Sequence, residues 1–302
     1  MGAKLVFGLI FFIFVVALLT LYWFVPLSET QFIVTQSGSN FTIGDLGSLE
    51  LQFYENMRFP SNRISYGIDK CTLKKTDDML RAFDILEDKT ILEFYPSSNP
   101  EISIVCDSRT KIDGGLFIAG EGGPTNITES GDFHLISHGQ ILLIKESDCP
   151  NPNIATHELM HVLGFDHIPN PKDIMYNISR CDQKINNESI NLINEIYSIP
   201  SAPDLAFHDF SAIMHGKYLD VNMTVKNEGF VSSPKSVIEV YADNKLVKKI
   251  DLISLDAGHG RIISLTNVWV KQISVDQIEL VIVSSAEELS NENNRVVLHI
   301  SG

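Results

Sequence analysis

The chain has 302 residues, enough for two domains of ordinary size and a short additional segment. Apolar residues make up 44% of it and charged residues 20%, which supports folded cores and excludes an extensively disordered protein. The formal net charge of -15 excludes the basic surface that nucleic-acid binding requires. We therefore expect a folded protein without a nucleic-acid partner, in which most carboxylates serve solubility.

The chain begins with an apolar segment. Leu5–Val25 contains no charged residue and is long enough to span a bilayer as a helix at about 1.5 Å per residue. Lys4 precedes it and Glu29 follows it, which places the amino terminus in the cytoplasm and the rest outside. A cleaved signal peptide is the alternative, but its apolar region is shorter and ends in small residues. We expect residues 1–29 to form an uncleaved transmembrane anchor that crosses the cell membrane once.

The four cysteines agree with an external location, since an even number in an oxidising compartment indicates two disulfides. They are Cys71, Cys106, Cys149 and Cys181. Three pairings are possible. We favour Cys71–Cys106 and Cys149–Cys181, because the second pair brackets the candidate metal site introduced below.

A change of pattern follows the apolar segment. Residues 30–57 are polar and predict a tether. Residues 64–68 alternate apolar and polar side chains, which predicts a strand. Thr76 and the two acidic residues after it are typical of a helix start, and the runs 91–95 and 102–106 predict two more strands. This order of elements opens an α/β or α+β domain.

The next region is rich in glycine between residues 113 and 126. Within it, Gly115–Ala119 predicts a short edge strand followed by a loop. Gly139–Ile144 predicts another strand, and Asn151–Phe165 and Ile185–Tyr197 predict helices. The first domain therefore extends over residues 58–200.

A domain boundary falls at Pro200–Pro203, a turn-forming stretch after which the pattern becomes purely β. Apolar and polar residues alternate over residues 219–225, 278–282 and 296–300. Several short strands with regular turns predict an all-β, immunoglobulin-like sandwich over residues 201–302.

The most informative motif is the string H-E-L-M-H-V-L-G-F-D-H at residues 157–167. His157 and His161 are four residues apart, so a helix places both on one face. Two imidazoles in this arrangement can bind one zinc ion at about 2.0–2.1 Å. Glu158 points to a different side of the helix and can contact a zinc-bound water without occupying the metal.

A catalytic zinc needs three protein ligands and one open position, which makes His167 the third candidate ligand. On a straight helix His167 could not meet the same metal as His161. The chain must turn between them, and Gly164 can take the left-handed conformation that ends a helix.

The full string H-E-x-x-H-x-x-G-x-x-H resembles the zinc signature of the metzincin clan. The sequence D-I-M-Y at 173–176 resembles the methionine turn of the matrix-metalloprotease-like branch, and the resemblance covers residues 58–200. It implies a zincin-like α+β domain, with a twisted mixed sheet and an active-site helix. It also implies that Met175 forms the floor under the zinc and that Tyr176 and Asn177 line the substrate pocket.

The resemblance implies a zinc endopeptidase that hydrolyses extracellular proteins through a zinc-bound water, with Glu158 as the general base. An edge strand, here Gly115–Ala119, would pair with an extended peptide substrate. Asp113 and Glu121 in the glycine-rich region are candidates for a structural calcium site. His134 and His138, with Asp132, are candidates for a second, structural metal site.

The C-terminal region resembles adhesion-type immunoglobulin-like (CARDB-like) modules of bacterial and archaeal surface proteins. The resemblance rests on Asp204-Leu205, on residues 226–229 and on E-L-S-N-E-N-N at 288–294. It implies a role in spacing or substrate docking. A non-catalytic surface adhesion protein that keeps a zincin fold is the alternative function, and a narrow-specificity processing peptidase is a third. We expect a monomer.

Overall fold

The structure is a computed structural model that describes residues 2–24, 29–44, 46–108, 111–113, 116–146, 148–272 and 274–301. The chain divides into two compact units. Unit 1 consists of Met1–Phe41, Pro203–Glu228 and Ser232–Gly302, and unit 2 consists of Thr42–Ala202 and Gly229–Val231. Each unit is described separately.

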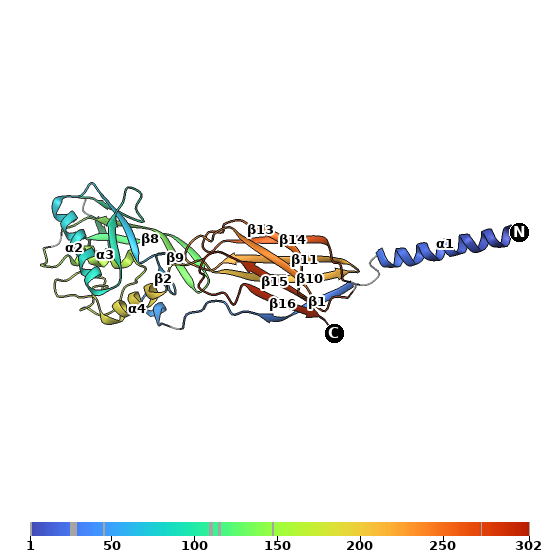
Figure 1. Ribbon diagram of the computed structural model, residues 1–302. Coiled ribbons are helices and arrows are strands. Elements are labelled where there is room, and N and C mark those ends of the chain that lie inside the picture. Colours follow the sequence, from blue (N-terminus) through green and yellow to red (C-terminus); the bar gives the residue numbers. More distant parts are fainter. Residues whose placement is uncertain are drawn as a thin grey trace. The chain divides into compact units, whose positions relative to one another are not determined.

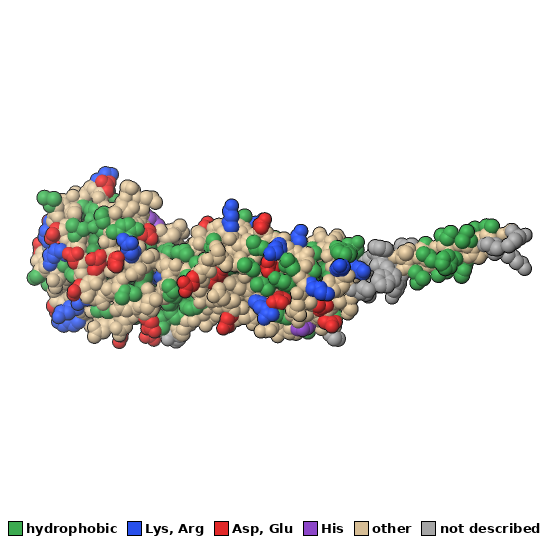
Figure 2. Space-filling model, viewed as in Figure 1, with side chains coloured by type: hydrophobic (Ala, Val, Ile, Leu, Met, Phe, Trp, Pro, Cys, Tyr) green, Lys and Arg blue, Asp and Glu red, His purple; other side chains and the backbone are tan. Residues whose placement is uncertain are grey.

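The apolar segment at the start of the chain is helical and forms α1 (Ala3–Phe24). Its described side chains extend from Val6 to Thr20, and Figure 2 shows apolar groups along this stretch. Among the described residues, no helix is long and apolar enough to cross a membrane. The predicted transmembrane helix is therefore not supported.

Unit 2 is built on a mixed sheet in which four parallel strands lie in the order β4-β3-β5-β9. Antiparallel β8 pairs with β9, and Figure 1 labels both strands. The short β2 pairs with β9 beyond the end of β5. The bounds are β2 (Met57–Arg58), β3 (Arg63–Asp69), β4 (Glu93–Pro96), β5 (Ile102–Cys106), β8 (Gly120–Ser130) and β9 (Phe133–Leu143). Strand predictions at residues 64–68, 91–95 and 102–106 are thus confirmed.

The edge of this sheet differs from the sequence-based prediction. Gly115 lies outside the described residues, and the rest of the predicted edge strand includes β7 (Leu116–Ile118), which pairs with β6 (Lys111–Asp113) in a separate two-stranded sheet. The edge is formed by β8, which continues through a turn into β9. The sequence pattern missed this long hairpin because glycine and polar residues interrupt the alternation over 120–130.

The described part of unit 2 has three α-helices, α2 (Leu73–Lys89), α3 (Asn153–Val162) and α4 (Asn187–Ser198), and a short 3-10 helix, η1 (Ser48–Glu50). α2 begins one turn before the predicted start, because Thr72 is its N-cap and accepts a hydrogen bond from the Lys75 backbone N–H at 3.3 Å. α3 packs on α2, β8 and β9, with most of its side chains buried. The sheet thus positions the helix that carries the H-E-x-x-H motif.

Close packing of α3 explains the glycines of β8. A methyl group at Gly122 would lie 2.4 Å from the carbonyl oxygen of Glu158, closer than real side chains approach a backbone atom. Gly139 on β9 faces Val162 in the same way, at 2.4 Å. The glycines of this hairpin therefore allow α3 to pack closely against β8 and β9.

Two disulfides hold unit 2, and both match the favoured pairing. Cys71 and Cys106 join the residues before α2 to the end of β5. Cys149 and Cys181 enclose the segment that contains α3 and the turn after it. The described cysteines include no free thiol.

Unit 1 is an antiparallel β structure with strand order β13-β12-β15-β16-β1-β10-β11-β14. Alternate residues of these strands contribute to one apolar core, as the alternating pattern predicts. The bounds are β1 (Glu29–Ser37), β10 (Leu205–His215), β11 (Tyr218–Asn227), β12 (Ser236–Ala242), β13 (Lys245–Leu252), β14 (Gly260–Trp269), β15 (Gln277–Val283) and β16 (Arg295–Ile300).

The strand β1 connects the two halves of this structure, although its residues fall in the segment predicted as a tether. Residues Glu29–Phe32 pair with β10, and Phe32–Ser37 pair with β16 after a register shift. Phe32, which takes part in both pairings, is buried in the core. A segment far away in sequence therefore completes this eight-stranded sheet.

Candidate metal centre

The helix α3 places His157 and His161 on one face, as their spacing predicts. His161 is buried and His157 half-buried, with ring centroids 4.5 Å apart. Burial lowers the pKa of both imidazoles, and that of His161 falls to about 4, where the nearby His157 adds to the effect. Both rings are thus neutral in the absence of metal, which is the form that binds a metal ion.

The chain turns at Gly164 and brings His167 back toward the helix. Gly164 has φ 95°, and its N–H donates to the His161 carbonyl at 2.9 Å. The His167 Nε2 then lies 3.2 Å from Nε2 of His161 and 3.3 Å from Nε2 of His157. A side chain at Gly164 would also meet Met57 at 2.7 Å, so glycine is needed for both conformation and space.

Two backbone carbonyls fix the orientation of the buried rings. His157 Nδ1 lies 2.6 Å from the carbonyl oxygen of Ile174, and His161 Nδ1 lies 2.8 Å from that of Phe165. A neutral imidazole that donates from Nδ1 has a free lone pair on Nε2. Both lone pairs are therefore available to a shared cation, with the exposed His167 beside them.

Glu158 occupies the neighbouring position on α3 and is only 6% exposed. A methyl group placed on Gly120 would lie 2.7 Å from Glu158 Oε1, so this carboxyl group lies directly against the start of β8. Burial, with a contribution from the charge of Glu121, raises the pKa of Glu158 to about 8. The carboxyl group is therefore held beside the histidines without a basic partner among the described ion pairs.

The methionine turn contacts the histidine cluster through the carbonyl of Ile174, which lies beside His157 Nδ1. Met175 is fully buried, and its carbonyl oxygen accepts a hydrogen bond from the Ile168 N–H at 2.9 Å. The carboxylate of Asp173 accepts from the Met175 N–H at 2.8 Å and from the Asn186 side chain at 2.6 Å. The sequence-based interpretation did not assign Asp173 a role, although its position in D-I-M-Y marked it.

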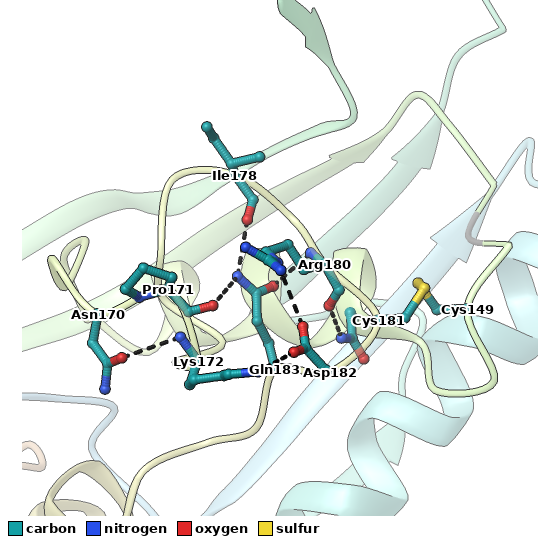
Figure 3. Close-up of polar contacts among 10 residues, drawn as sticks. Cys149, Asn170, Pro171, Lys172, Ile178, Arg180, Cys181, Asp182 and Gln183 are labelled. Carbon is teal, nitrogen blue, oxygen red and sulfur yellow. Dashed lines mark hydrogen bonds and ion pairs between the residues drawn. A yellow bond between two sulfur atoms is a disulfide. The ribbon is translucent and has the colours of Figure 1, made fainter.

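The rest of this turn is fixed by side chains, as Figure 3 shows. Gln183 bonds with the Ile178 carbonyl, at 2.9 Å, and with the Arg180 N–H, at 2.8 Å. Asp182 forms ion pairs with Lys172 and Arg180. The Cys149–Cys181 disulfide anchors the end of the turn, so the backbone of this turn is held at several points.

Phe53 is an additional residue at the site that sequence reasoning missed. Its ring stacks on His161 with centroids 5.7 Å apart, and its N–H donates to the Gly164 carbonyl at 2.9 Å. The side chain of Gln52 closes the loop that contains Phe53, because it accepts a hydrogen bond from the Met57 N–H and donates one to the Met57 carbonyl. Part of the predicted tether is therefore a structural element of unit 2.

The other residues predicted to line the substrate pocket or to bind structural metals lie in several parts of unit 2. Tyr176 is half-buried and Asn177 exposed, directly after the buried Met175. Of the predicted calcium pair, the side chain of Asp113 lies outside the described residues and Glu121 belongs to β8. The structure separates the histidines proposed for a second metal: His134 contacts the Glu55 carbonyl and His138 contacts Ser103.

The three histidine nitrogens fit a zinc ion. Tetrahedral ligands at about 2.0–2.1 Å from zinc are separated by roughly 3.3 Å, which matches the separations of Nε2 atoms here. Within the described ranges, this is the group of three or more His, Cys, Asp or Glu side chains whose ligand atoms lie close enough to hold one metal ion. The helix, the turn after it and the buried methionine resemble the zinc centre of metzincin metallopeptidases.

Comparisons with known proteins support both parts of the resemblance. Residues 58–198 match the family model for Matrixin (Peptidase_M10), and residues 202–297 match the model for CARDB. No curated protein matched the chain. Among solved structures, the chain is similar to the CARDB domain of the PF1109 protein from Pyrococcus furiosus in complex with di-metal ions. That match has 19% identity, covers 33% of this chain and 88% of that chain, and has a TM-score of 0.28.

Proposed function

We propose that unit 2 is a zinc endopeptidase that hydrolyses peptide bonds of extracellular proteins, with His157, His161 and His167 as metal ligands. The observation that carries this proposal is the convergence of three Nε2 atoms beside the buried carboxyl group of Glu158. When bound, zinc polarises the scissile carbonyl and lowers the pKa of water.

Glu158 is the proton-transfer residue in this proposal. Its carboxylate takes a proton from the attacking water and delivers it to the nitrogen of the leaving amine. Its position against Gly120 places that transfer next to the edge of the sheet. A protein that only binds would not need an acid at this position, which is why the adhesion-only alternative is less favoured.

Substrate binding is assigned to the edge strand β8. In the described part of the chain β8 pairs with β9, and an extended peptide would add to the sheet along the opposite side of β8. Backbone pairing reads chain geometry more than side-chain identity. Tyr176 and Asn177, which follow the methionine turn, would then contact the substrate side chain that enters the pocket.

The location of unit 2 outside the cytoplasm is part of the proposal, and its two disulfides support it. Protease treatment of intact cells should degrade unit 2, and fractionation should separate a released from a membrane-held protein. Protection of unit 2 until the cells are lysed would contradict an external location.

The test of the activity is the variant Glu158→Gln, compared with Glu188→Gln as a matched control on the exposed start of α4. Both variants should bind one zinc ion per chain. Glu158→Gln should cleave a peptide library at least about 100-fold more slowly than the parent, whereas the control should be unchanged. Equal cleavage by Glu158→Gln and the parent would exclude this residue as the base.

A further inference from the structure

Unit 1 contains a buried polar cluster that the proposed peptidase activity does not use. Asp204 lies immediately before β10, and Glu288, Asn293 and Asn294 lie in the loop before β16. Their exposed fractions are 1%, 7%, 3% and 7%. Four polar side chains are thus nearly excluded from solvent at one end of these strands.

Hydrogen bonds join the four side chains into two pairs, and the backbone of Leu205, the residue after Asp204, links the first pair to Glu288. Asn293 Nδ2 donates to Asp204 Oδ1 at 2.9 Å, and Asn294 Nδ2 donates to Glu288 Oε2 at 3.2 Å. The Leu205 N–H donates to the same Glu288 oxygen at 2.8 Å. Because each amide gives its nitrogen to a carboxylate, the orientation of its oxygen is fixed as well.

Each of these side chains retains one buried oxygen without a hydrogen-bond partner. The atoms are Asp204 Oδ2, Glu288 Oε1, Asn293 Oδ1 and Asn294 Oδ1. All four are acceptors. Leaving a buried polar atom unsatisfied is unfavourable, so four such oxygens in neighbouring side chains point to a missing electron-pair acceptor.

The charge of the cluster has the same implication. Asp204 and Glu288 are buried carboxyl groups, and the described ion pairs provide neither with a lysine or arginine partner. Burial raises the pKa of Asp204 to about 6, and the charges of Glu228 and Glu288 contribute. Water could supply donors to the free oxygens, but it could not offset two buried negative charges.

We propose that Asp204, Glu288, Asn293 and Asn294 form a binding site for a calcium ion in unit 1. An all-oxygen set of carboxylates and amide carbonyls is the ligand chemistry of hard divalent cations, and calcium accepts six to eight such oxygens in flexible geometry. The site joins the first residue before β10 to the loop before β16, so the ion fixes these two segments together. This site is distinct from the pair Asp113 and Glu121.

The affinity should lie in the range of extracellular modules, about 10⁻⁴–10⁻³ M. The proposal is independent of peptidase activity, since its residues belong to unit 1 and the histidine cluster to unit 2. A failure of one proposal therefore leaves the other unaffected.

The test uses the zinc-loaded full chain in calcium-free buffer, titrated with calcium chloride to 10 mM and, separately, with sodium chloride of equal ionic strength. Calcium should raise the unfolding temperature of unit 1 by about 5–10 °C at tenfold excess over Kd. It should also slow amide hydrogen exchange in peptides that cover 204–206 and 286–295. Sodium chloride should do neither.

The variants Asp204→Asn and Glu288→Gln keep the size of the side chains and remove one buried charge each. Both should fold without calcium and lose the calcium-dependent shift and protection. Glu287→Gln, an exposed neighbour, should respond as the parent does. The proposal is overturned if the parent shows no calcium-specific protection in these peptides, or if Asp204→Asn and Glu288→Gln respond like the parent.

Discussion

His157 Nδ1 lies 2.6 Å from the carbonyl oxygen of Ile174, which links the metal-binding helix directly to the methionine turn. Ile174 is held in place by its neighbours. Asp173 bonds the Met175 N–H and the Asn186 side chain, and the Ile174 N–H donates to the Lys184 carbonyl at 2.9 Å. The orientation of one ligand ring therefore depends on the carboxylate of Asp173.

We predict that Asp173→Ala lowers zinc affinity by roughly tenfold or more, because groups that orient ligands contribute this much to metal binding. Competition with a chromogenic chelator measures the change. Asp182→Ala is the control in the same turn, since Asp182 forms only exposed ion pairs. An Asp173→Ala variant with parental zinc affinity would show that the turn does not position His157.

The contact between β8 and α3 gives a second prediction. Gly122→Ala should destabilise unit 2 by about 1–3 kcal/mol, because the added methyl group meets the backbone of Glu158 and the helix must shift. Gly123→Ala is the control, since a methyl group at that position would have no atom within 4 Å. Urea unfolding of zinc-loaded protein measures both, and equal stability of the two variants would contradict the packing described.

The two disulfides should differ in their effect on the metal centre. Their sequence separations of 32 and 35 residues are similar, so removing either should cost about 3–4 kcal/mol of stability. Replacing Cys149 and Cys181 by serine should also lower zinc affinity, because this disulfide closes the segment that carries the ligands. Replacing Cys71 and Cys106 should leave zinc affinity unchanged in the fraction that folds.

A buried arginine supports the C-terminal end of α4. Arg58 is fully buried and donates to the carbonyl oxygens of Ile196, at 2.6 Å, and Ile199, at 3.2 Å, with Tyr197 packed under its guanidinium. Burial lowers its pKa to about 10, so it stays charged at neutral pH. Arg58→Met should cost about 2–4 kcal/mol by leaving these carbonyls unpaired.

The exposed Arg63 serves as a control for this substitution, since it forms a surface ion pair with Glu93. Arg63→Met should change stability by no more than about 0.5 kcal/mol in the same unfolding assay. A similar cost for both arginines would mean that the bonds of Arg58 to the end of α4 contribute little.

The sequence was sufficient to predict that the three histidines lie together, because the geometry there is local. Four-residue spacing on a helix fixes His157 and His161 on one face, and the need for a turn at Gly164 follows from the position of His167. The strand pattern of β11 was equally readable, since alternation reports which face is buried.

Features that depend on distant partners were not predictable in this way. β1 contains no regular alternation, and its pairing with β10 and β16 is decided by residues far along the chain. Phe53 gave no signal because its contact with His161 depends on the fold of the intervening chain. The side chains around Asp204 belong to two short sequence motifs, and their burial and hydrogen bonds depend on segments that meet only in the folded chain.

The most direct test of the metal centre is X-ray absorption at the zinc edge, combined with metal analysis of the full chain. A hydrolytic centre should hold one zinc per chain, with three imidazole nitrogens at about 2.0–2.1 Å and one light-atom ligand from solvent. The solvent ligand should be replaced by a hydroxamate added in excess. A fourth protein ligand that resists this replacement, or fewer than three imidazoles, would contradict a hydrolytic centre.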